Sequence, residues 1–208
     1  MTPASLACLT GLVLGAACAT SGGAGGGLEL GLKRGASWST LDVRPPRVTG
    51  PNAMLELKRG RLVGVFQSRP ISIEITPDGL SGQVGGAGGG PAGEAGSIEV
   101  DITGTAENLE VAGLWCGQRV HLSITPESLR GTIRGPTAGH CQYVLDRVDK
   151  GGARAGTSIC SGLPEPTSLE LPSGLPKALG RSEIVAVLLV LLSSPPITSH
   201  ESARPLAR

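Results

Sequence analysis

Alternation of apolar and polar residues is the clearest pattern in this chain, and it occurs twice. In "ISIEITPDGLSGQVGG", residues 71–86, isoleucines alternate with polar residues before a turn. The stretch "VHLSITPESLRGTIRG", residues 120–135, repeats this pattern with the same alternation and the same glycines near its end. Period-two alternation is typical of a half-buried β-strand. Each stretch therefore predicts a strand, a turn and a second strand.

The turn between the two predicted strands is part of the repeat. The Thr-Pro pair at residues 76–77 returns at residues 125–126, and an acidic residue follows each proline. Proline favours the first central position of a turn, because its ring already fixes the φ angle that this position needs. A looser similarity extends upstream, so the repeat units are about residues 55–86 and 98–135.

Two such units predict a mainly β domain over residues 28–150. One antiparallel meander buries its apolar face poorly alone, whereas two can face each other as a small sandwich or a partly open barrel. The Gly-rich segment 85–96 predicts a flexible connector between the units. Its "GGGPAG" fits a nucleotide-binding G-x-G-x-x-G formally, but no helix is expected after it to present amides to phosphate.

The alternation stops at Gly151, and the rest of the chain is rich in proline and glycine. Residues 151–175 predict a linker. Residues 176–193 contain "IVAVLLVLL", which predicts a short buried element, either a helix or a central strand, with the helix favoured. Nine apolar residues are too few to span a bilayer. Residues 194–208 predict a disordered tail, so the whole segment is a Pro-rich, partly helical C-terminal tail.

The composition limits the kind of core that can form. The chain has 33 glycines and 16 prolines, but only one Phe, one Tyr and two Trp. Large aromatic side chains bury the most area each, so this core depends on aliphatic residues instead. The scarcity of aromatics and of dense Lys/Arg runs also disfavours nucleic-acid binding.

The N-terminal residues predict export. Residues 1–18 are uncharged, with an apolar stretch that ends in small residues, as in a secretory signal peptide. The segment "LGAAC", which ends at Cys18, resembles the lipobox of bacterial lipoprotein precursors, although Leu14 stands one position further from the cysteine than in that family. The resemblance covers residues 1–27 and implies lipidation of Cys18, with residues 19–27 as a Gly-rich tether. The expected location is the outer membrane or periplasm. Cleavage after Ala19 instead would give a soluble periplasmic or secreted protein.

The cysteines of an exported chain predict one disulfide. Cys8 lies in the predicted signal peptide and Cys18 in the lipobox, which leaves three cysteines. The pairing is either Cys116–Cys141 or Cys141–Cys160, and the sequence does not choose between them.

A non-catalytic binding or structural module at the cell envelope is the function that these features predict, with no cofactor and no catalytic residues. Its expected partners are the membrane, through the lipid anchor, and an unknown envelope protein or small ligand. The alternative is a small secreted enzyme or a metal or redox protein that uses Cys116, His121, His140 and Cys141. Their spacing is poor for a metal site, because adjacent residues of a strand point to opposite faces.

Overall fold

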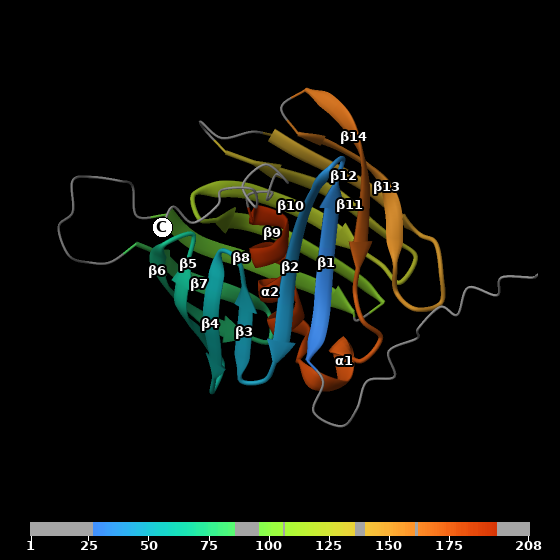
Figure 1. Cartoon of the computed structure of the whole chain (residues 1–208). Helices are drawn as coiled ribbons and strands as arrows, with labels where there is room; N and C mark the ends of the chain where they lie inside the picture. Colours follow the sequence, from blue (N-terminus) through green and yellow to red (C-terminus); the bar gives the residue numbers. More distant parts are fainter. Residues whose placement is uncertain (1–26, 86–95, 106, 136–139, 161, 195–208) are drawn as a thin grey trace, which may run out of the picture.

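The computed structural model describes residues 27–85, 96–105, 107–135, 140–160 and 162–194 (Figure 1). The predicted signal peptide, Cys18, nearly all of the tether, most of the Gly-rich connector and nearly all of the predicted disordered tail lie outside these residues. The elements are β1 (Leu28–Arg34), β2 (Ser37–Arg44), β3 (Arg47–Gly50), β4 (Ala53–Lys58), β5 (Arg61–Phe66), β6 (Arg69–Thr76), β7 (Gly79–Val84), β8 (Gly96–Thr105), β9 (Asn108–Trp115), β10 (Gln118–Ile124), β11 (Ser128–Arg134), β12 (His140–Arg147), β13 (Arg154–Cys160), β14 (Leu163–Glu170), α1 (Leu175–Ala178) and α2 (Arg181–Ser193).

The strands form one closed antiparallel barrel of fourteen strands. Each strand pairs with its neighbours in sequence, and β1 pairs with β14 to close the ring, with Leu32 opposite Leu169. The prediction of a mainly β fold is confirmed, but the expected sandwich or partly open barrel is wrong. Closure pairs each described strand on both sides, whereas an open arrangement of two meanders would leave edge strands unpaired.

The two repeat units correspond to β4–β7 and β8–β11, which lie side by side in the barrel wall. Each unit has a glycine with an unusual backbone conformation in the middle of a strand, Gly64 in β5 and Gly113 in β9. Gly64 and Gly113 have φ angles of +145° and +139°, a region that residues with a side chain rarely adopt. A Cβ atom at Gly113 would clash with the backbone of Glu99 on β8, and one at Gly64 with that of Met54 on β4. Glycine at this position lets the strand bend with the wall.

Residues 151–175, predicted as a linker, contain β13 and β14 instead. The domain predicted for residues 28–150 is therefore incomplete, because the barrel closes only through these two strands. Their inward positions include polar residues, which hid the alternation. Ser158 on β13 and Thr167 on β14 are buried and join by a hydrogen bond of 2.7 Å between their hydroxyl groups. Prolines in β14 also disfavoured a strand prediction.

The helix α2 lies inside the barrel (Figure 1). Every residue from Val185 to Leu192 is at most 3% exposed, so the helix is buried on all its sides. It contacts β1, β2, β6 and β7, and α1 packs against its first turn. The predicted apolar element at 176–193 is thus a helix and not a strand, and it is part of the core. No helix in the described part of the chain is long and apolar enough to cross a membrane.

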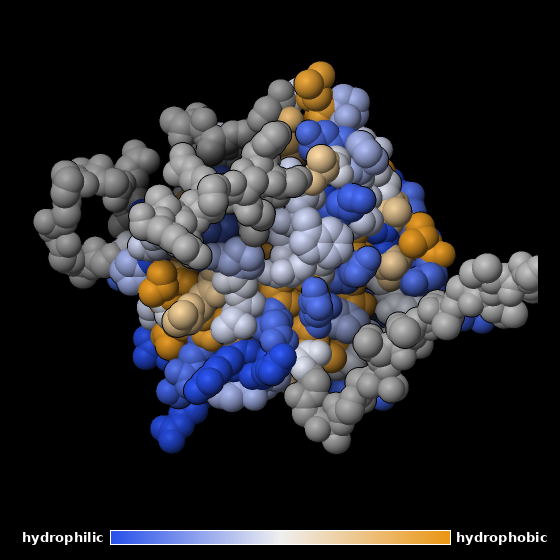
Figure 2. All heavy atoms as spheres, in the orientation of Figure 1, coloured by the Kyte–Doolittle hydropathy of each residue, from blue (hydrophilic) through white to orange (hydrophobic). Residues whose placement is uncertain are grey.

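The outer face of the barrel is largely polar. On β8, for example, Ile98, Val100 and Ile102 point inward while the residues between them are exposed. Figure 2 shows a mainly hydrophilic surface on one side of the molecule, with apolar residues in separate small clusters. The apolar side chains therefore converge on α2, together with three of the four aromatic residues, Phe66, Trp115 and Tyr143.

Replacing Gly113 with Ala is expected to destabilise the barrel by more than about 3 kcal/mol, because the new methyl group meets the backbone of β8 in a conformation already unfavourable for alanine. Gly162→Ala is the matched control, since Gly162 also has a positive φ, +97°, but nothing within 4 Å of the added Cβ. Denaturant unfolding followed by the fluorescence of buried Trp115 measures both. Equal losses of stability in the two variants would contradict the assignment of a close backbone approach at Gly113.

Candidate functional site

A cavity of about 440 Å³ opens at the end of the barrel where α2 enters. The walls come from the ends of β9, β10, β12 and β13, from the segment after β14, and from α1 and the first turn of α2. This end of the barrel is crossed by residues 171–180 instead of being filled by α2, which we call the plug helix. The cavity is thus a consequence of how the chain turns back into its own barrel.

One part of the cavity wall is aliphatic. Its apolar lining comes from Leu109, Ile124, Leu171, Leu175, Leu179 and Ile184, with three prolines beside them. No described residue of the lining is aromatic. A wall of this kind removes alkyl groups from water but offers no flat ring face for stacking.

The other part of the wall is cationic, and its central residue is Arg154 at the start of β13. Arg154 is only 8% exposed, which is rare for an arginine without a paired acid. The guanidinium donates hydrogen bonds to three backbone carbonyls, those of Gly152 (3.2 Å), Thr125 (2.9 Å) and Pro126 (3.4 Å). Its Nε has no hydrogen-bond partner, and no described carboxylate forms an ion pair with it.

The environment of Arg154 disfavours its positive charge. Burial lowers the pKa of the guanidinium, and the neighbouring charge of Arg147 lowers it further. Glu127 acts in the opposite direction, but it is not close enough to form an ion pair. Arg154 is therefore a buried cation that Glu127 offsets only from a distance and that forms no ion pair with any described residue.

Three further cations line the cavity: Arg147, Lys150 and Arg181. Arg147 donates to the backbone carbonyls of Asp149 (2.6 Å) and Lys150 (3.3 Å). No aspartate or glutamate occurs among the described residues of the lining. The cavity thus combines an aliphatic wall with one that carries four cationic side chains, of which Arg181 is paired with Asp78 outside the lining.

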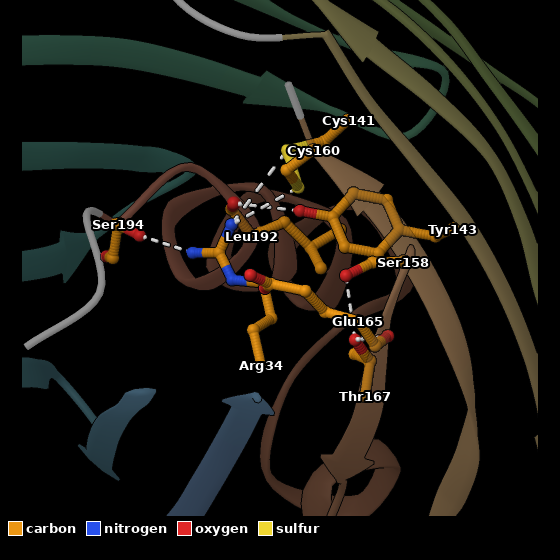
Figure 3. The surroundings of a disulfide bond; sticks show 9 residues. All are labelled: Arg34, Cys141, Tyr143, Ser158, Cys160, Glu165, Thr167, Leu192 and Ser194. Carbon is orange, nitrogen blue, oxygen red and sulfur yellow. Dashed lines mark hydrogen bonds between the residues drawn. A yellow bond between two sulfur atoms is a disulfide. The ribbon is translucent and has the colours of Figure 1, made fainter. Parts of the chain in front are cut away.

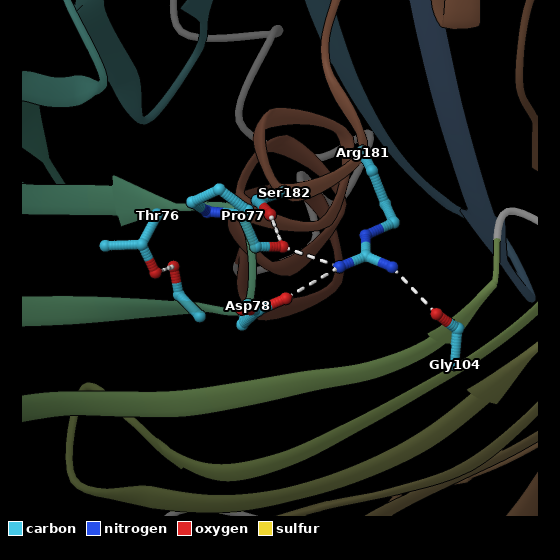
Figure 4. Close-up of polar contacts among 7 residues, drawn as sticks. Thr76, Pro77, Asp78, Gly104, Arg181 and Ser182 are labelled. Carbon is cyan, nitrogen blue, oxygen red and sulfur yellow. Dashed lines mark hydrogen bonds and ion pairs between the residues drawn. The ribbon is translucent and has the colours of Figure 1, made fainter.

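Arg181 also fixes the start of α2 to the barrel (Figure 4). Its guanidinium donates to the carbonyls of Pro77 (2.6 Å) and Gly104 (2.8 Å), and Ser182 Oγ donates to the same Pro77 carbonyl at 2.9 Å. Asp78 lies 3.2 Å away and forms an ion pair with Arg181, although its carboxylate is 90% exposed and the pair is worth little. These contacts set where the plug helix begins.

The repeated Thr-Pro turns have equivalent roles at this end of the barrel. Pro77 in the first unit accepts from Arg181, and Pro126 at the same position of the second unit accepts from Arg154. The repeat was visible in the sequence, but nothing in the sequence connected either turn to an arginine far along the chain.

The disulfide joins Cys141 to Cys160, the second of the two predicted pairings (Figure 3). These residues lie directly opposite each other on β12 and β13, with Cα atoms 4.2 Å apart. Cys116, the partner in the other pairing, lies in the turn after β9 and is a free thiol. A loop of this length stabilises the fold by about 3 kcal/mol if the crosslink acts mainly on the unfolded chain.

The disulfide lies at the other end of the barrel, next to the last turn of α2 (Figure 3). Arg34 Nη1 is 3.9 Å from Cys141 Sγ and 3.8 Å from Cys160 Sγ, while its Nη2 donates to the carbonyl of Ser194 at 2.8 Å. Tyr143 donates to the carbonyl of Leu192 at 3.3 Å and Gln67 to that of Ser193 at 2.7 Å. Three barrel side chains therefore satisfy carbonyls that a helix end leaves unpaired.

The alternative site of Cys116, His121, His140 and Cys141 is not assembled in the structure. His121 on β10 and His140 at the start of β12 are exposed, and Cys141 is in the disulfide. The described residues contain no group of three or more His, Cys, Asp or Glu that could hold a metal ion.

The thiol of Cys116 is poorly suited to act as a nucleophile. Burial raises its pKa from 9.0 to about 12, and the nearby charge of Arg69 lowers it only in part. Because the thiolate is the reactive form, this thiol is largely inert at neutral pH.

Comparison of the chain with family models, with curated proteins and with solved structures gave no match. The lipoprotein resemblance of residues 1–27 therefore remains a prediction.

Cys116 in the folded protein is expected to react with iodoacetamide at a rate that still rises in proportion to hydroxide at pH 9.0, because its pKa lies near 12. Peptide mapping of the alkylated protein identifies the label, with Cys116→Ser as the control. In the unfolded chain this thiol ionises near pH 9.0, so its contribution to stability is complete below that pH and falls as the pH rises toward 12. A rate that levels off near pH 9.0 in the folded protein would contradict the raised pKa.

Proposed function

We propose that the protein is an exported, lipid-anchored envelope protein and a non-catalytic binding module that takes a small, largely apolar molecule into the cavity at the entry end of the barrel. The observation that carries this proposal is the cavity itself, with its aliphatic wall and buried arginine. It lies where the plug helix leaves the interior unfilled.

The size and chemistry of the cavity support binding. A volume of about 440 Å³ is within the range of small-molecule sites, and such sites combine an apolar lining with a few placed polar groups. The described lining contains Arg, Lys, Ser and Thr as its polar side chains, and none of the His, Cys, Asp or Glu residues that usually carry acid–base or nucleophilic steps. The donor set is thus one that holds a ligand in place.

Two observations support the proposed location. The signal-like residues 1–18 precede a Gly-rich segment that can separate a lipidated Cys18 from the barrel. The Cys141–Cys160 disulfide is of a kind that persists in oxidising compartments such as the periplasm. The membrane is then a partner through the anchor, and the ligand of the cavity is a separate, small partner.

A neutral apolar dye, N-phenylnaphthylamine, is expected to bind the full chain saturably with a rise in fluorescence. Ile124→Trp, which fills the cavity from β10, is expected to weaken that binding at least tenfold. Ile75→Trp is the matched control, because Ile75 occupies the same position of the first repeat unit and does not line the cavity. Absence of saturable binding, or equal loss in both variants with intact thermal unfolding, would overturn the proposed site.

The proposed anchor is tested by the intact mass of the mature product after expression of the full chain in a diderm bacterium. A product that begins at Cys18 and carries acyl groups is expected, and Cys18→Ala is expected to abolish the acyl mass. A product cleaved after Ala19 without lipid would contradict the anchor and indicate a soluble exported protein. A product that still begins at Met1 would contradict export.

A further inference from the structure

We propose that the ligand of the cavity is an aliphatic amphiphile with an anionic head group, and that Arg154 is the residue that binds this head group. The inference rests on the proposed function and names the ligand class of the same site. The head group is a carboxylate or a phosphate, and the alkyl chain lies against the aliphatic wall.

The first argument is the uncompensated charge of Arg154. A buried cation loses its hydration, and protein structures normally offset that loss with a paired acid. Arg154 is 8% exposed, and its hydrogen-bond partners among the described residues are neutral carbonyls. An anion in the cavity would supply the missing counter-charge.

The second argument is the number of donors left over. A guanidinium has five N–H groups, arranged as a fork that suits carboxylate and phosphate. Among the described residues, Arg154 Nη1 donates to one carbonyl and Nη2 to two, while the buried Nε has no partner. The second N–H of Nη1 therefore remains as a donor for an anionic oxygen.

The internal repeat provides a comparison within the same molecule. In the first unit, Asp78 follows Pro77 and forms an ion pair with Arg181. In the second unit, Glu127 holds the equivalent position after Pro126 but forms no ion pair with Arg154. The same turn thus lies beside an arginine with an ion pair in one copy and beside one without an ion pair to the described residues in the other, and the second arginine is the more deeply buried.

The third argument is the rest of the lining. Arg147 and Lys150 add positive charge near Arg154, and no acid of the described lining opposes them. The apolar wall consists of Leu, Ile and Pro side chains, without an aromatic ring among the described residues. This composition suits an alkyl chain better than a planar ring system.

Isothermal titration of the full chain with decanoate, decanol and decylamine tests the head-group preference directly in the unaltered protein. Decanoate is expected to bind at least tenfold more tightly than decanol, and decylamine most weakly, because charge-assisted hydrogen bonds favour the anion. Equal affinities for decanoate and decanol would overturn the head-group inference while leaving the binding site in place. Absence of binding by all three, together with absence of dye binding, would instead overturn the proposed function.

Substitution of Arg154 identifies the residue responsible. Arg154→Gln is expected to lower decanoate affinity about tenfold or more and to leave decanol affinity unchanged, whereas Arg154→Lys retains part of the preference. Arg134→Gln is the control, because Arg134 is an exposed cation of β11 outside the cavity. If Arg154→Gln does not fold, Arg154→Lys is measured instead, and an undiminished preference for decanoate over decanol in that variant would contradict the assignment of the head group to the guanidinium.

Two more titrants distinguish a phosphate from a carboxylate head group, and an amphiphile from a simple anion. Decyl phosphate against decanoate distinguishes a phosphate head group from a carboxylate, and inorganic phosphate alone tests whether the chain is needed. Tight binding of inorganic phosphate without any gain from the decyl chain would overturn the amphiphile inference in favour of a simple anion site.

Discussion

The helix α2 imposes the constraint on which this fold depends. A helix that is apolar on every side cannot rest on a surface and must be surrounded. Barrels of about eight strands are filled by their own side chains, whereas wider ones enclose space. Fourteen strands leave room for one helix of thirteen residues, about 20 Å long. The strands and the helix therefore need each other, because neither buries its apolar surface without the other.

The ends of α2 show how the plug is held in place. At its C-terminal end, Arg34, Gln67 and Tyr143 satisfy carbonyls that the helix leaves free, and the disulfide lies against Arg34. At its N-terminal end, Arg181 and Ser182 bind the first Thr-Pro turn. The cavity lies at the N-terminal end, beside residues 171–180, which lead into α2.

The sequence predicted the strands whose alternation was regular, and the repeat that β4–β7 and β8–β11 form. It could not predict closure, because alternation indicates which face of a strand is buried but not how many strands share one sheet. The strand β13 was missed since its buried positions hold Arg154 and Ser158 rather than aliphatic residues. The run at 184–192 has no apolar period, so helix and strand remained open until the barrel around it was known.

The candidate site was less predictable than the fold for a related reason. Arg154 stands in a Gly-rich segment where an arginine is expected to be solvated, and only the closed barrel buries it. The disulfide pairing likewise depended on β12 and β13 being neighbours. Local sequence therefore identified the chemistry of individual residues, while their environment came from pairings between strands that the sequence did not reveal.

The duplicated unit explains why the contact that fixes the start of α2 resembles the surroundings of Arg154 in the candidate site. Both Thr-Pro turns present carbonyls to a guanidinium at the same end of the barrel. In the first unit that guanidinium belongs to the plug helix and is partly neutralised by Asp78, which makes it an anchor. In the second it belongs to the barrel wall, lines the cavity and forms no ion pair with the described residues. The same turn thus holds the helix in one copy and, in the other, supports the arginine to which we assign the proposed ligand.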